Sequence, residues 1–159
     1  MELDPANGPL LRQLAEQART ARAHGRAPFI DLTADWCPPA RAIKESLAHP
    51  LMTDAFAGTH VVLASIDDFS EELQAGPYRF TKIPMFLPFD ESGQPIGDPI
   101  DGGAWGEDTP ENMARALRPF FRSHGATSVA PPPRPSLKSA VTMAVAGLVL
   151  LALATWLRR

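Results

Sequence analysis

The chain has 159 residues, 45% of them hydrophobic, and residues 1–123 hold all 18 acidic residues against 11 Lys and Arg, a net charge of −7. A body of about 120 residues has the usual size of a single domain. Its acidic balance argues against a surface that binds nucleic acid. The four histidines form no pair at metal-ligand spacing and the chain has one cysteine, so we expect neither a metal site nor a cofactor.

The first third of the chain predicts a helix, a buried strand and a second helix. Apolar residues recur at helical spacing between residues 8 and 25, which predicts an N-terminal helix. Residues 29–33 form a short run of strand-forming residues that contains one acidic residue, Asp31. Two prolines, at positions where the first turn of a helix accepts them, predict a helix over residues 38–47.

The only cysteine, Cys37, lies between this strand and the helix that follows it. One thiol cannot close a disulfide within the chain. Unpaired N–H groups and the helix dipole at a helix N-terminus favour a thiolate, and Arg41 adds a positive charge one turn further on. We therefore expect an accessible, reactive thiol at Cys37, against the simpler interpretation of an inert core residue.

The middle of the chain predicts a mixed sheet. We expect the further elements in this order: a short helix at 50–56, a strand at 60–66, a helix at 70–75, a hairpin of strands at 85–89 and 95–100, and a last helix from Pro110, capped by Thr109. Pro88 cannot donate a hydrogen bond within a sheet, so it indicates an edge or a strand end. The order predicts an α/β sandwich with a central mixed β-sheet flanked by helices.

The segment from Asp31 to Arg41, with its Ala-Asp-Trp-Cys sequence, resembles the active-site segment of the thioredoxin superfamily. Together with residues 46–50 and 53–56, it is most similar to the C-terminal domain of the bacterial thiol:disulfide interchange protein D. The sequence Lys82-Ile83-Pro84 lies about 45 residues after the cysteine, where that family has a cis-proline before a strand. The resemblance covers about residues 26–122 and implies a thioredoxin-like sandwich.

One departure from the family changes the expected chemistry. Ala40 stands where the family has its resolving cysteine. A first thiolate attacks a disulfide and a second thiol then releases the mixed disulfide, so only the first step is left to this chain alone. The family's buried Asp assists the resolving thiol, and the role of Asp31 here therefore stays open. The resemblance implies catalytic roles for Cys37, Trp36 and Asp31, and contacts with the partner's segment for Ile83, Pro84 and Pro38.

The end of the chain predicts a membrane anchor. Residues 139–157 are nineteen residues without a charge, and as a helix they would extend about 28 Å against a hydrocarbon thickness of about 30 Å. The proline-rich residues 123–138 predict an extended tether. The first residues lack the basic start and apolar run of a secretory signal. We therefore expect a single-pass C-terminal anchor with the domain in the cytoplasm.

These features lead to one main hypothesis and two alternatives. The main hypothesis is a membrane-tethered monothiol protein in which Cys37 forms a mixed disulfide with a partner protein or with glutathione. The first alternative is a redox-inactive thioredoxin-fold module for binding or assembly at the membrane. The second is a glutathione-assisted iron–sulfur or metal site shared between two chains. The sequence predicts no particular oligomeric state.

Overall fold

The structure is a computed structural model that describes residues 1–127. The predicted transmembrane segment at 139–157 lies outside these residues. Their elements, in chain order, are a 3-10 turn η1 (Pro5–Asn7), α1 (Leu10–Ala23), β1 (Ala27–Thr33), α2 (Pro38–Ser46), α3 (Pro50–Ala55), β2 (Thr59–Ser65), α4 (Ser70–Ala75), β3 (Met85–Pro88), β4 (Ile100–Asp101) and α5 (Pro110–Ser123). Among the helices of residues 1–127, none combines the length and the apolar character needed to span a bilayer.

The four strands form one mixed sheet in the order β2-β1-β3-β4. β1 runs parallel to β2 and antiparallel to β3, and β3 runs antiparallel to β4. β1 is therefore central, and its residues 29–33 are all buried, as expected for a strand covered on both faces. The predicted α/β sandwich with a mixed sheet is confirmed for the described residues, and this arrangement fits a thioredoxin-like fold.

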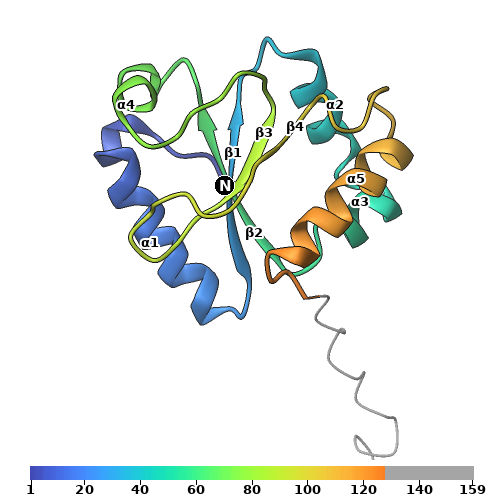
Figure 1. Ribbon diagram of the computed structural model, residues 1–159, viewed down its shortest axis with the longest axis horizontal. Helices are drawn as coiled ribbons and strands as arrows, with labels where there is room; N and C mark the ends of the chain where they lie inside the picture. The colour runs from blue at the N-terminus through green and yellow to red at the C-terminus, as the bar shows by residue number, and fades with distance from the viewer. Residues whose placement is uncertain (128–159) are drawn as a thin grey trace, which may run out of the picture. The chain divides into compact units, whose positions relative to one another are not determined.

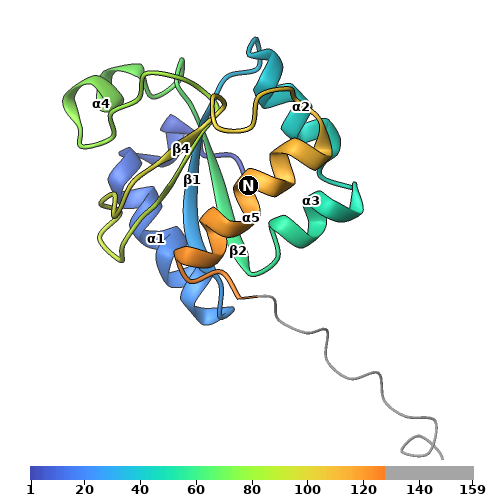
Figure 2. The same ribbon diagram turned by 45° about the vertical axis from the view of Figure 1, so that its right-hand side comes forward.

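Helices cover the two faces of the sheet, with α1 on one side and α2, α3 and α5 on the other (Figure 1; Figure 2 shows the same layers from another side). The first face joins α1 and α4 to the sheet through a core that includes Leu14, Ile30, Leu32 and Phe69. The second face holds an aromatic core, in which Phe121 of α5 packs edge-on against Phe29 and Phe86 with ring centroids 4.8 and 5.5 Å apart.

The second strand of the predicted hairpin lies elsewhere. We expected it at residues 95–100, but β4 comprises Ile100–Asp101. Pro95 and Pro99 have no N–H to donate, and Gly97 between them has a φ of +70°, which interrupts an extended strand. Residue 95 keeps a single bridge to Phe89, and β3 ends at Pro88, as that proline predicted.

Residues near both ends of the described chain make further hydrogen bonds with the sheet and with the last helix. The Leu3 N–H donates to the Leu63 carbonyl and the Leu63 N–H donates to the Met1 carbonyl, both at 2.8 Å, so the first residues extend the sheet beyond β2. The sequence analysis did not predict this pairing. At the other end α5 begins at Pro110, and the Thr109 side chain accepts a hydrogen bond from the Asn112 N–H, as expected for its cap.

Candidate functional site

Cys37 is the residue that precedes the first turn of α2, at the end of the loop that leaves β1. Pro38 and Pro39 occupy the first two helical positions. The N–H groups at these positions have no partner within a helix, so proline costs no helix hydrogen bond there. The Cys37 N–H donates to the Ala34 carbonyl, and the Cys37 carbonyl accepts from the Arg41 N–H, both at 3.1 Å. The thiol is therefore held at the helix start, where the strand-to-helix pattern placed it.

The surroundings of the thiol differ from the expected open position. Cys37 is only 5% exposed, and it forms a small apolar cluster with Ala34 and Ala40, against which Ile66 and Ile83 pack. Burial of this kind depends on three separate segments meeting, which the local sequence around Cys37 does not reveal. Ala40, at the position of the family's second cysteine, adds an apolar methyl group to this cluster instead of a second thiol.

The loop before β3 supplies the opposite wall of the site. The Cys37 thiol donates a hydrogen bond to the Ile83 carbonyl at 3.5 Å, and the helix N-terminus makes no bond to the sulfur. The Ile83–Pro84 peptide bond is cis, as the resemblance to the thioredoxin superfamily implied. The Gly102 N–H donates to the Pro84 carbonyl at 3.0 Å, which ties the loop to the end of β4. The structure thus brings Ile83 and Pro84 beside Cys37.

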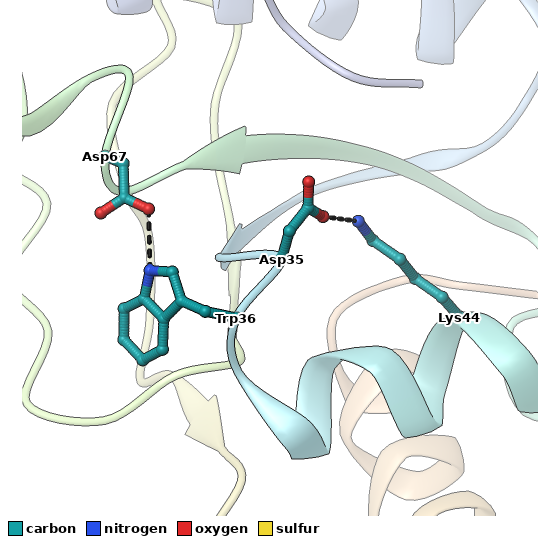
Figure 3. A network of polar contacts seen from close by, with 4 residues as sticks. All are labelled: Asp35, Trp36, Lys44 and Asp67. Atoms are coloured by element: carbon teal, nitrogen blue, oxygen red, sulfur yellow. Dashed lines mark hydrogen bonds and ion pairs between the residues drawn. The ribbon is translucent and has the colours of Figure 1, made fainter.

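Trp36 lies next to the thiol in the chain but points toward solvent. Its side chain is 61% exposed, and its indole N–H donates to Asp67 Oδ2 at 2.8 Å (Figure 3). On the other side of the same loop Asp35 pairs with Lys44 of α2 at 2.7 Å, and this hydrogen-bonded ammonium lowers the pKa of the Asp35 carboxyl. The sequence analysis did not single out Asp67, although its position directly after the second parallel strand was a usable signal.

Asp31 is buried in the middle of β1, at 6% exposure. Burial raises the pKa of its carboxyl to about 7, and the charge of Lys44 opposes this shift. Its Oδ1 has no hydrogen-bond partner among the described residues, and the side chain lines a largely apolar hollow of about 180 Å³ between α2 and β2. No hydrogen bond within residues 1–127 joins Asp31 to Cys37, so its predicted catalytic role stays a prediction.

Metal-binding side chains do not converge on this site. Within residues 1–127, no group of three or more His, Cys, Asp or Glu side chains lies close enough to hold a metal ion. The groups that do meet are one thiol, one half-buried peptide carbonyl and an exposed indole. These groups can perform sulfur exchange or hold a partner's segment, but they offer no ligand set for an ion.

Comparison with known proteins finds distant structural likenesses. No protein-family model and no curated protein sequence matches it. The chain is similar to the disulphide isomerase of Xylella fastidiosa Temecula1, with 18% identity over 73% of this chain and 91% of the other and a TM-score of 0.49. It is also similar to the thioredoxin of Fasciola hepatica, with 19% identity over 71% and 88% and a TM-score of 0.46, and to mitochondrial thioredoxin 3 of Saccharomyces cerevisiae, with 21% identity over 67% and 89% and a TM-score of 0.43.

Identities this low do not carry a function from these proteins to the chain. The assignment of the fold rests on the strand order and on the parallel pairing of β1 with β2. A cysteine at the start of the helix after β1 and a cis-proline before β3 lie at neighbouring points of this fold. A thiol at this point of the chain has the chemistry needed for thiol–disulfide exchange.

Proposed function

We propose that the chain is a membrane-tethered, thioredoxin-like protein that uses Cys37 alone for thiol–disulfide exchange. The observation that carries the proposal is the position of the Cys37 sulfur, 3.5 Å from the Ile83 carbonyl and at the N-terminus of α2. A partner's extended segment that lies along Ile83 and Pro84 would bring its own sulfur beside this thiol. Trp36, exposed next to it, offers that segment an apolar surface.

The proposed exchange needs two successive attacks. The Cys37 thiol gives its proton to solvent, and the thiolate attacks one sulfur of a partner disulfide, whose other sulfur leaves as a thiolate. This step forms one S–S bond and breaks one, so it needs no outside oxidant. A thiol from glutathione or from a second protein then attacks the mixed disulfide and releases Cys37, because Ala40 cannot do so.

The proposal also includes a specific resemblance to one family of thiol–disulfide proteins and a C-terminal membrane anchor. Similarity to the C-terminal domain of thiol:disulfide interchange protein D is supported by the Ala-Asp-Trp-Cys segment and residues 46–50. Tethering is supported by the nineteen uncharged residues 139–157. The proposal places the domain in the cytoplasm, where a free thiol such as that of Cys37 would stay reduced.

Trapping of adducts in cells tests the exchange directly. Cells are quenched with acid, free thiols are blocked with N-ethylmaleimide, and the protein is separated without reductant. We expect discrete, reductant-sensitive adducts of the wild-type chain and none of Cys37→Ser, which has no thiol at all. A chain that combines Cys37→Ser with Ser123→Cys controls for any exposed thiol, because Ser123 is exposed at the end of α5. The same adducts from this control would contradict a special role of Cys37.

The burial of Cys37 also favours a second candidate, a redox-inactive module for binding or assembly. Cys37 is 5% exposed and its thiol donates to the Ile83 carbonyl, and a cysteine held in this way is protected from reagents as well as from partners. The rate of alkylation by iodoacetamide across pH separates the two functions. A midpoint below the free-cysteine value of about 8.5 supports exchange, and a midpoint at or above it supports the binding module.

A further inference from the structure

A second hollow lies at the carboxyl ends of the two parallel strands, close to the loop that carries Trp36 and Cys37. It has a volume of about 180 Å³. The loops that follow β1 and β2 meet here because the strands are parallel and adjacent, with Thr33 paired to Ser65 at their ends. The lining residues are Glu2, Thr33, Ala34, Asp35, Ser65, Asp67 and Asp68.

The hollow is strongly acidic. Four of its lining side chains are carboxylates. Within residues 1–127, one of these four carboxylates forms an ion pair, namely Asp35 with Lys44. Asp67 receives the Trp36 indole N–H, which leaves its charge unneutralised. Glu2 is brought in by the pairing of the first residues with Leu63, which is a feature of the fold and not of the local sequence.

A buried hydroxyl without a partner gives an independent indication of a ligand. Thr33, which lines the hollow, is 2% exposed, and its Oγ1 has no hydrogen-bond partner among the described residues. A buried hydroxyl usually finds one, since leaving it unpaired costs roughly 1–3 kcal/mol. A ligand with N–H donors would satisfy this oxygen and the carboxylates together.

The ligand that fits is a basic side chain. The carboxylates are too far apart to enclose one metal ion, since no group of three metal-binding side chains converges within residues 1–127. A guanidinium group carries five N–H donors in a planar fork, and it can therefore bridge separated carboxylates and a hydroxyl. The hollow thus matches arginine, or lysine with fewer bonds, better than a bare cation.

One residue connects this hollow with the thiol. Ala34 lines the hollow and also packs against Cys37 in the apolar cluster. We propose that the hollow receives a basic side chain of the protein segment whose cysteine reacts with Cys37, so that partners with Arg or Lys near that cysteine are selected. This inference rests on the proposed exchange function. Residues two apart in an extended segment lie about 7 Å apart on the same side, so a basic residue two positions from the cysteine would point the same way as it does.

Activated peptides test the selection on the full chain in detergent micelles. Each peptide carries one cysteine as its mixed disulfide with 2-thiopyridine and has Arg, Lys, Gln or Glu two residues before or after it. The Cys37 thiolate attacks the peptide sulfur, the S–S bond breaks, and 2-thiopyridone leaves with one proton and absorbs light. We expect the better-placed Arg peptide to react about tenfold faster than its Gln counterpart at low salt, with the advantage falling as salt rises.

Matched variants locate the effect. Glu2→Gln combined with Asp68→Asn should remove most of the rate advantage of the Arg peptide over the Gln peptide, because both side chains line the hollow. Glu16→Gln combined with Asp98→Asn makes the same change of net charge at exposed positions outside the hollow, and it should keep the advantage. Equal losses in both double variants would overturn the site.

A binding measurement separates failure of the hollow from failure of the exchange function. Fluorescent peptides with Ser in place of the cysteine are followed by anisotropy, which needs no thiol chemistry. If no activated peptide releases thiopyridone, the exchange function is wrong, and tighter binding of the Arg peptide would still support the hollow. Equal binding and equal rates of the Arg and Gln peptides would overturn the hollow. Loss of the preference in millimolar Ca²⁺ or Mg²⁺ at constant ionic strength would also overturn it, in favour of a metal ion.

Discussion

The chemistry of Cys37 is decided by the few atoms around its sulfur. The Cys37 thiol donates a hydrogen bond to the Ile83 carbonyl at 3.5 Å. A thiolate would lose that hydrogen bond and meet the negative end of the carbonyl dipole. The N-terminus of α2 acts in the opposite direction, because it favours negative charge. A partner segment whose N–H groups approach Ile83 would change this balance when it binds.

Asp31 has a measurable consequence for stability. Burial raises its pKa from 3.8 to about 7, so between these pH values the folded state binds a proton that the unfolded state releases. The free energy of unfolding therefore falls as pH rises through this range. We expect Asp31→Asn, which cannot titrate, to gain on the order of 4 kcal/mol relative to wild type between pH 4 and pH 8. Urea unfolding of both proteins at each pH measures the difference.

A surface carboxylate controls for this titration. The pKa of Asp35 is lowered by its hydrogen bond with Lys44, so its contribution to stability is lost as pH falls and not as pH rises. Asp35→Asn should therefore show no relative gain with increasing pH. Parallel pH profiles of wild type and Asp31→Asn would show that the pKa of Asp31 is the same in the folded and the unfolded protein, contrary to the effect of its burial.

Among the elements, those with a strong local pattern could be predicted from the sequence. β1 and α5 follow from an apolar run and from helical spacing with a capping Thr109. Neither the position of β4 nor the pairing of Leu3 with Leu63 could be read this way, because both depend on hydrogen bonds to distant strands. The same holds for the site. The cis-proline was implied by the family resemblance of the sequence around Pro84, whereas the burial of the thiol and the acidic hollow arise from loops that only the fold brings together.

α5 contains a proline in its interior, where proline destabilises a helix. Pro119 is exposed in the interior of the helix, where it lacks the N–H that would bond to the Arg115 carbonyl and where its ring crowds that carbonyl. We expect Pro119→Ala to raise the free energy of unfolding by about 1–3 kcal/mol, measured by urea denaturation. Pro110→Ala is the matched control. Pro110 is at the first helical position, so its replacement should bring no gain.

At the scale of the whole molecule, an acidic head is joined to a predicted anchor. The net charge of −7 over residues 1–123 would be repelled by anionic lipid headgroups. The predicted tether of residues 123–138 has an upper reach of roughly 50 Å at about 3.1 Å per residue. If residues 139–157 enter a bilayer, both features would oppose close contact between the acidic domain and anionic headgroups.

The predicted anchor can be tested independently of the thiol. We expect the full chain to stay with membranes after alkaline carbonate extraction and a chain that ends at residue 138 to be released. Two charges in the middle of the segment, Leu148→Arg with Leu151→Arg, should have the same effect, because each costs about 2.5–3.5 kcal/mol at the bilayer centre. Leu148→Ile with Leu151→Ile keeps the apolar character and should stay with the membranes. If the full chain were extracted as readily as the shortened one, residues 139–157 would not span a bilayer, and exchange at Cys37 would have to be sought with soluble partners.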